Sequence, residues 1–373
     1  KALVKDLSVG QRQRVEILKA LYRNARVLIM DEPTAVLVPQ EVEQLFESLE
    51  RLREQGLSVI FISHKLNEVM AITDRVSVLR LGEHAGTVET QSSSPAELAR
   101  MMVGRETFGV TKAAANPAQG KVVLEMTQVA ALDNKGLPAL KDITLQVRTG
   151  EILGLAGVSG NGQTELAQVL DGTRQAIAGQ IKVLNHDITN VGPEKVMAAG
   201  VGRIPEDRHE SVVTEMSVAQ NMALEHLDEF TQRGVLNKKT ILQHAQKLIA
   251  EYQIKASPGD KIRTLSGGNM QKVILARVLE RNPQLIIVAQ PTRGLDVGAT
   301  EYVRGKLLEQ RRKGAAILLI SEDLDEIFEL ADTIAVIYEG EIMDVLPAAA
   351  AETERLGLLM SGVKAEKAGA HGL

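Results

Sequence analysis

Two adjacent carboxylates follow a short apolar run near the start of the chain. Residues 27–30 are apolar, and Asp31 and Glu32 come directly after them. In a parallel sheet, ligands bind beyond the carboxyl ends of the strands, so an acid pair at such an end is well placed to act on one. Asp31 suits coordination of Mg²⁺, and Glu32 suits orienting or deprotonating an attacking water. The alternative interpretation is a solvated strand end that carries two acids.

A glycine-rich loop with phosphate-binding spacing lies in the second half of the chain. Residues 157–164 read GVSGNGQT, which fits the pattern G-x-x-x-x-G-x-T directly after the apolar run 152–156. Such glycines let backbone N–H groups turn inward around phosphate oxygens, and the following helix adds a favourable dipole. Gln163 stands where the phosphate-binding lysine belongs, so it can form a hydrogen bond but brings no charge. We predict contact with a nucleotide without hydrolysis, through Gly157, Gly160, Asn161, Gly162, Gln163 and Thr164. The alternative is a tight strand–helix turn with no ligand.

One histidine follows an apolar run in the first half of the chain. His64 comes after residues 58–62 and Ser63. A lone histidine is more often structural or on the surface. At the carboxyl end of a strand, however, it could hydrogen-bond a γ-phosphate and the attacking water. We therefore predict a catalytic role for His64.

Two similar pentapeptides each lead into an amphipathic stretch. They are Leu7-Ser8-Val9-Gly10-Gln11 and Leu265-Ser266-Gly267-Gly268-Asn269. A serine hydroxyl, backbone N–H groups and a helix dipole together would bind an anion. A plain helix N-cap would explain a single copy equally well. Because there are two copies, we predict nucleotide binding by Ser8, Gly10, Gln11, Ser266, Gly267, Gly268 and Asn269.

The second pentapeptide begins 258 residues after the first, and the surrounding sequence aligns at the same offset. The frame residues that coincide are Pro33-Thr34 with Pro291-Thr292, Leu37 with Leu295, and Ser63 with Ser321. The catalytic candidates change instead, and the pairs are Asp31 with Ala289, Glu32 with Gln290, and His64 with Glu322. This internal repeat predicts two copies of one phosphate-handling module. Only the first copy keeps the acid/base residues.

The elements that must position these residues follow an α/β pattern. Apolar runs of strand length alternate with helix-like stretches, which predicts parallel sheets covered on both faces. In residues 1–104 we predict the back part of one domain, with strands at 26–30, 58–62 and 75–79 and a helix over 42–53. Residues 105–121 have the composition of a linker. We predict a second domain over 122–362, with a helical insertion at 205–262, and a disordered tail over 363–373.

Composition narrows the class of protein. A chain of 373 residues fits about two domains of roughly 150 residues each. It has no cysteine, which excludes disulfides and thiolate metal sites and is typical of a reducing compartment. No apolar run approaches the roughly 18 residues that span a bilayer. A net charge of −5 and an aromatic content of 2% argue against a nucleic-acid partner.

Together these motifs resemble those of ABC-type ATPase subunits. Residues 7–11 are similar to the family's signature motif, residues 30–32 to the Walker B motif with its catalytic glutamate, and His64 to the switch histidine. Two such modules in one chain resemble the importer ATPases for simple sugars and nucleosides. Residues 14–22, 204–209 and 289–299 resemble the nucleoside branch more closely. The fold class implied is α/β, with two tandem ABC-type P-loop ATPase domains, the first of them incomplete, and a parallel sheet core with a helical subdomain.

The resemblance implies a mechanism and partners. ATP and Mg²⁺ would be the cofactors, with Asp31 as the metal ligand and Glu32 and His64 as catalytic residues. Two domains would close head to tail, so that each nucleotide lies between the Walker motifs of one and the signature of the other. The competent site would combine the acids with residues 266–269, and the second site would combine residues 157–164 with Ser8, Gly10 and Gln11. The partners implied are integral-membrane permease subunits and an extracytoplasmic substrate-binding lipoprotein, at the cytoplasmic face of the cell membrane.

No Walker A motif precedes the first pentapeptide, which begins at Leu7. We therefore expect the first domain to be incomplete at its N-terminal side, by roughly 100–150 residues, and the printed chain by itself to hydrolyse ATP negligibly. Three alternatives to a nucleoside importer stay open. They are an importer ATPase for a simple sugar such as ribose or galactose, a soluble twin-ATPase that acts on ribosomes, and a regulatory module that binds nucleotide without hydrolysing it.

Overall fold

The computed structural model describes residues 15–16, 19–20, 22, 25–34, 39–63, 65–80, 82–103 and 120–363. Of the predicted site residues, Ser8, Gly10, Gln11 and His64 lie outside this part of the chain. Most of the predicted linker and tail also lie outside it. The chain divides into two compact units, one of residues Lys1–Gly109 with Asp296–Gly298, and the other of the remaining residues.

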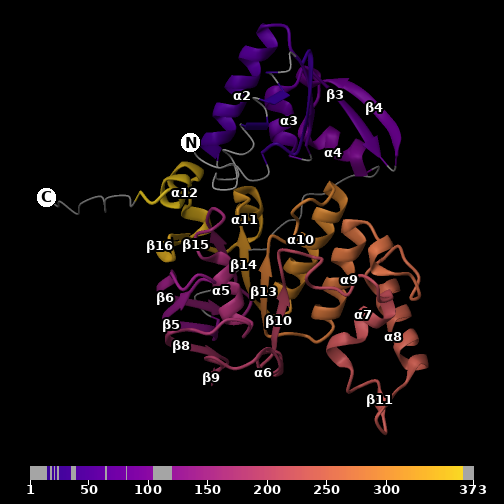
Figure 1. Cartoon of the computed structure of the whole chain (residues 1–373), viewed down its shortest axis with the longest axis vertical. Coiled ribbons are helices and arrows are strands. Elements are labelled where there is room, and N and C mark those ends of the chain that lie inside the picture. Colours follow the sequence, from indigo (N-terminus) through magenta and orange to yellow (C-terminus); the bar gives the residue numbers. More distant parts are fainter. Residues whose placement is uncertain are drawn as a thin grey trace, which may run out of the picture. The chain divides into compact units, whose positions relative to one another are not determined.

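A six-stranded sheet forms the centre of the second unit (Figure 1). Its strands, in spatial order, are β10 (Val201–Ile204), β13 (Leu285–Ala289), β14 (Ala316–Ser321), β7 (Ile152–Ala156), β15 (Thr333–Tyr338) and β16 (Glu341–Pro347). All neighbouring pairs are parallel except β15 and β16. Continuous apolar runs form strands buried on both faces, as β7, β13 and β14 are here. The strand predicted over 152–156 is confirmed.

A second, antiparallel sheet was not predicted from the sequence. It contains β6 (Pro138–Arg148), β5 (Val122–Leu132), β8 (Ala178–Val183) and β9 (His186–Asp187), in that spatial order. Helix α5 (Gln163–Leu170) packs against the two sheets, because Leu166 and Leu170 share one apolar cluster with Leu145 and Ile287. Strand β6 alternates between buried and exposed residues, as is typical of a half-buried strand, so it is not one of the continuous apolar runs from which the strands were predicted.

Helices cover the other side of the central sheet. They include α9 (Gly267–Leu279), which packs against β10, whereas α7 (Val218–Ala223) and α8 (Lys238–Glu251) lie beyond α9; Figure 1 shows these two helices to the side of the sheet, away from β5, β6 and β8. The predicted insertion at 205–262 is therefore helical in part. It also contains the two-stranded hairpin β11 (Thr231–Gln232) and β12 (Val235–Leu236). The hairpin turns at Arg233 and Gly234, whose positive φ angles of 51° and 80° suit a two-residue turn.

The first unit contains a short parallel sheet and an antiparallel pair. Its elements are β1 (Val27–Asp31), α2 (Pro39–Glu54), β2 (Ser58–Ile62), α3 (Leu66–Ile72), β3 (Arg75–Arg80), β4 (Glu83–Glu89) and α4 (Pro95–Val103). Strands β1 and β2 are parallel, and β3 and β4 are antiparallel. The strand predicted over 58–62 and the helix predicted over 42–53 are confirmed, whereas β4 was missed.

The elements of the two units correspond at the offset found in the sequence. The residue bounds of five pairs differ by 258 at both ends, namely β1 and β13, α2 and α10 (Val297–Arg312), α3 and α11 (Leu324–Leu330), β3 and β15, and β4 and β16. The strand registers agree as well, since Val27 pairs with Ser58 and Leu285 pairs with Ala316. Even the irregularity between Val78 and Leu79 recurs, between residues 336 and 337.

The corresponding strands differ in how they are covered. Ile29 of β1 is 65% exposed, whereas its counterpart Ile287 of β13 is 1% exposed. Ile60 of β2 is 50% exposed, whereas Leu318 of β14 is fully buried. In the second unit these positions belong to the cluster formed with α5. The prediction that both faces of the sheet are covered is therefore wrong for β1 and β2 among the described residues.

This difference predicts unequal costs for the same substitution. In the printed chain, Ile287→Ala should lower the free energy of unfolding by about 2–5 kcal/mol, because it opens a cavity in a packed core. Ile29→Ala should lower it by less than about 1 kcal/mol, because its side chain contributes little buried area. Urea unfolding followed by circular dichroism checks both variants. Equal costs would show that Ile29 is buried in solution.

Candidate functional site

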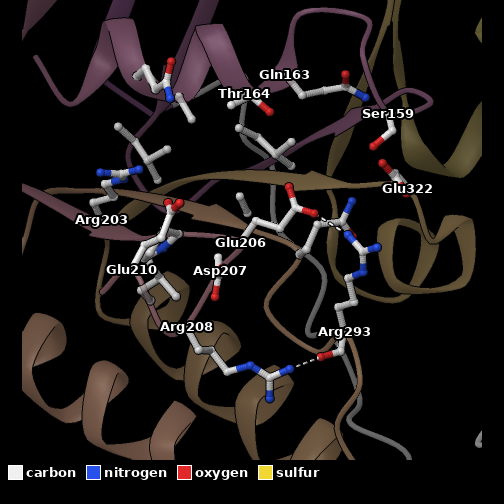
Figure 2. Close-up of a pocket in the computed structure, with 18 of the residues that line it drawn as sticks. Ser159, Gln163, Thr164, Arg203, Glu206, Asp207, Arg208, Glu210, Arg293 and Glu322 are labelled. Carbon is white, nitrogen blue, oxygen red and sulfur yellow. Dashed lines mark hydrogen bonds and ion pairs between the residues drawn. The ribbon is translucent and has the colours of Figure 1, made fainter. Parts of the chain in front are cut away.

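A cavity of about 610 Å³ lies at the carboxyl ends of β7, β10, β13 and β14 in the second unit (Figure 2). Its walls come from the glycine-rich loop and α5, from the loop after β10, and from the segments that follow β13 and β14. The lining residues include Ser159, Gly160, Gln163, Thr164, Arg203, Glu206, Arg208, Gln290, Arg293 and Glu322. This is the edge of the sheet at which the sequence predicted a ligand.

The glycine-rich loop has the backbone conformation that its glycines predict. Gly160 and Gly162 have φ angles of 87° and 105°, which disfavour any residue with a side chain. At Gly157 the reason is space, since a Cβ there would lie 2.6 Å from Nε2 of Gln163 and 2.8 Å from Ile337. The loop therefore closes tightly on the side chain of Gln163.

Gln163 lies within its own loop, where it is 8% exposed. Its Nε2 donates to the carbonyl oxygen of Val158 at 3.1 Å, and its Oε1 accepts from the N–H of Asn161 at 3.2 Å. One backbone N–H of the loop thus points at an amide oxygen of the same chain. A phosphate would have to displace this side chain to reach that donor. Thr164, the next residue, is exposed and lines the cavity.

Asn161 holds the loop to a neighbouring turn. Its Oδ1 accepts from the N–H of Glu339 at 2.7 Å, and its Nδ2 donates to Val158 at 2.9 Å. Its own carbonyl oxygen accepts from the N–H of Gly340 at 3.0 Å. The side chain predicted to contact a nucleotide is therefore engaged in fixing the loop against the turn between β15 and β16.

The strand ends around this cavity carry different chemistry from their counterparts in the first unit. Ala289, Gln290 and Glu322 line the cavity at the positions that correspond to Asp31, Glu32 and His64. Figure 2 shows Glu322 near Ser159 of the glycine-rich loop. At these positions the cavity wall therefore has neither an acid pair nor a histidine, and Gln163 takes the place of the loop lysine. Within the described ranges no group of three or more His, Asp or Glu residues is placed to hold a metal ion.

In the first unit, the acid pair ends strand β1 as predicted. Asp31 is the last residue of the strand and is exposed. Glu32 has a φ of 45°, and its N–H donates to Ile62 at 2.9 Å. Gln290 repeats this geometry, with a φ of 45° and a bond of 2.8 Å to Ile320. A left-handed conformation is costly for a residue with a long side chain, and such strain concentrates at functional sites.

The sequence did not reveal that a glutamate anchors each of these strand ends, Glu68 in the first unit, where it is partly buried, and Glu326 in the second, where it is buried. Thr34 donates from Oγ1 to Glu68 at 2.5 Å, and Thr292 donates to Glu326 at 2.6 Å. Ser321 also donates to Glu326, at 2.8 Å. Glu326 is 1% exposed, and this burial raises the pKa of its carboxyl group. The offset of 258 residues relates Thr34 to Thr292 and Glu68 to Glu326. This repetition is the signal in the sequence that could have revealed the two Thr–Glu pairs.

The second pentapeptide begins α9. Ser266 is the N-cap residue, and its Oγ accepts from the N–H and the Nδ2 of Asn269, at 3.4 Å and 3.0 Å. The Oδ1 of Asn269 accepts from the N–H of Lys255 at 2.8 Å. Ser266 and Gly267 are exposed, so this end of the helix presents its dipole and N–H groups to solvent.

A parallel sheet with a glycine-rich loop between strand and helix, and a cavity at its carboxyl edge, has the arrangement of a P-loop nucleotide-binding domain. A family model described as ABC transporter matches residues 1–35 and 140–293. A solved ATP-binding cassette of an ABC transporter is similar with a TM-score of 0.56 and 22% identity, over 65% of this chain and 98% of that chain. A nucleotide-free ATP-binding cassette is similar with a TM-score of 0.53 and 24% identity, over 60% and 91%. These two likenesses concern the fold alone.

Curated relatives match nearly the whole chain. The glucose import ATP-binding protein TsgD13 of Haloferax volcanii is 48% identical, over 97% of this chain and 66% of its own length. The nucleoside import ATP-binding protein NupA of Lactococcus lactis is 46% identical, over 97% and 72%. The guanosine import ATP-binding protein NupO of Bacillus subtilis is 44% identical, over 98% and 72%.

The chain therefore belongs to the ABC transporter family, as one of its ATP-binding proteins. It spans 66 to 72% of the length of these three relatives. Among the described residues, no helix combines the length and apolar character needed to cross a membrane.

Proposed function

We propose that the complete protein is the ATP-binding subunit of an ABC importer, and that it hydrolyses ATP to drive nucleoside uptake. The observation that carries this proposal is the asymmetry between the two repeats. The acid pair Asp31–Glu32 ends a strand in the first, while Ala289 and Gln290 take those places in the second. The import functions of NupA and NupO support the transport role.

We further propose tandem ATPase domains, over residues 1–104 and 122–362, joined by a linker at 105–121. The five pairs of elements related by 258 residues support this division. In this proposal the first domain has a preceding segment, which covers the exposed side of β1 and β2. The exposure of Ile29 and Ile60 supports it, since α5 and its neighbours cover their counterparts in the second unit. Ile29→Ala should then be costly in the complete protein.

The proposed hydrolytic site joins residues of both repeats. Asp31 would bind Mg²⁺, Glu32 would polarise the attacking water, and His64 would contact the γ-phosphate. The exposed N-terminus of α9, with Ser266, Gly267, Gly268 and Asn269, would supply donors to the same ATP. The second site would consist of Gly157, Gly160, Asn161, Gly162, Gln163 and Thr164, completed by Ser8, Gly10 and Gln11. We propose that it holds nucleotide without cleaving it.

In this function the subunit would associate with integral-membrane permease subunits at the cytoplasmic face of the membrane. A substrate-binding lipoprotein would deliver the cargo to the permease. A second candidate cargo is a simple sugar, which the 48% identity to a glucose import protein favours. Ribose import proteins are also among the relatives, at up to 41% identity.

Uptake measurements test the function and separate the two cargoes. The complete protein with its permease and binding protein, reconstituted in vesicles, should accumulate labelled nucleosides when ATP is supplied on the ATPase side. Labelled ribose, galactose and glucose should not accumulate. Accumulation of a sugar instead would show that the protein serves an importer whose cargo is a sugar and not a nucleoside. No ATP-dependent accumulation of either class, together with binding to ribosomes, would reject the importer.

A further inference from the structure

The loop after β10 forms part of the cavity wall and contacts the segment that follows β13. It contains Glu206 and Arg208, and it ends near Ser211. Arg208 donates from Nη2 to the carbonyl oxygen of Arg293 at 2.6 Å (Figure 2). The side chain of Arg293 in turn forms an ion pair with Glu206 of the same loop. The loop is thereby tied twice to the segment that follows β13.

The guanidinium of Arg208 also lies against the pentapeptide at the start of α9. A Cβ on Gly267 would lie 2.7 Å from Nη1 of Arg208, and a Cβ on Gly294 would lie 3.4 Å from its Nη2. Two glycines therefore leave the space that this planar group occupies. Because the guanidinium is planar with several fixed donors, it can contact two segments at once where a lysine could not.

A second arginine fixes the far end of the same loop to α9. Arg277, in the interior of the helix, is 5% exposed and donates from Nη2 to the carbonyl oxygen of Ser211 at 2.8 Å. Its Nε pairs with Glu225 at 2.8 Å. The loop is thus attached to α9 at the helix N-terminus through Arg208 and in the helix interior through Arg277. Through these contacts, a shift of the loop would also shift the pentapeptide.

Arg208 is charged and half-buried. Burial lowers its pKa from the ordinary value, the neighbouring Asp207 opposes that shift, and Arg293 adds to it. An arginine remains protonated at neutral pH despite such shifts. Placing a charge in partly desolvated surroundings is costly unless its hydrogen bonds are made, so its contacts with the Arg293 segment constrain its position.

We propose that Arg208 is a positioning residue, which holds Ser266–Asn269 in register with the segment Arg293–Gly294. The inference rests on the proposed function, in which the N-terminus of α9 contributes to the hydrolytic site of Glu32. Arg208 would then act on the chemistry through the pentapeptide, without touching the ATP. A displacement of about 1 Å in such a donor group can slow a reaction by about a hundredfold.

The test uses the complete ATPase with its permease. Arg208→Gln should lower kcat for ATP hydrolysis at least tenfold, while the Kd for ATP measured without Mg²⁺ changes less than twofold. The matched control is Arg281→Gln, two residues beyond the other end of α9, whose guanidinium contacts Met197 and Glu225. This control should keep kcat within twofold. Thermal unfolding of each variant verifies that it is folded.

A second variant displaces the guanidinium without deleting it. Gly267→Ala puts a methyl group 2.7 Å from Nη1, too close for the guanidinium to stay in place, so it should also lower kcat at least tenfold. In the Arg208→Gln background, the same change should cost less than threefold, because the clash is gone. Additive losses would overturn the proposal, as would wild-type kcat in Arg208→Gln. If Glu32→Gln left turnover intact, the proposed function would fail instead.

Discussion

Glu32→Gln should reduce ATP turnover of the complete transport ATPase by at least about a hundredfold, the lower range of what a positioned general base contributes. The substitution keeps the size of the side chain and removes only its charge and basicity. The backbone at Glu32 is left-handed, with its N–H bonded to Ile62, and an amide of equal length leaves this geometry unchanged. Phosphate release measured at saturating ATP checks the result.

The second unit provides the matched control for this experiment. Gln290 has the same φ of 45° and the equivalent bond to Ile320. Gln290→Asn is suited to that conformation, because asparagine tolerates the left-handed region better than most residues. It should change turnover less than twofold. Equal losses from the two substitutions would reject the idea that a single acid-bearing site hydrolyses ATP.

The repeat made much of the fold predictable. The offset of 258 residues was visible in the pentapeptides, and the structure places corresponding strands and helices at the same offset. Strands such as β2 and β7 could be located because each is a short apolar run that ends in polar or glycine residues. The sheet of β5, β6, β8 and β9 could not, because its pairing depends on contacts between distant segments.

The candidate site was predictable in its residue types and less so in its contacts. The carboxyl edge of the sheet was located correctly by Asp31 in one unit and by the glycine-rich loop in the other. The sequence did not indicate that Gln163 bonds to its own loop, since its side-chain amide could equally have faced the cavity. Nor could it show that Arg208 packs beside Gly267, because that contact joins residues 59 positions apart through the fold.

Gln163→Lys should increase the affinity of the 373-residue chain for ATP by about 10- to 100-fold, since a hydrogen bond to a charged group contributes about 1.5–3 kcal/mol. The present side chain occupies the N–H of Asn161 and the carbonyl oxygen of Val158. A lysine cannot accept from that N–H, so the donor becomes available to a phosphate oxygen. It also adds the positive charge that the loop lacks. Titration calorimetry with ATP measures the change.

The control places the same charge elsewhere on the cavity wall. Ser159 is exposed and lines the cavity, so Ser159→Lys adds a lysine at the rim without freeing the loop. It should raise affinity less than threefold. Gln163→Lys should bind ATP without gaining hydrolysis, because Ala289 and Gln290 still replace the acids. Tight binding without turnover would show that Gln163 accounts for the low affinity for phosphate, and that the missing acids account for the absence of hydrolysis. Unchanged affinity in Gln163→Lys would instead mean that this loop is only a turn between β7 and α5.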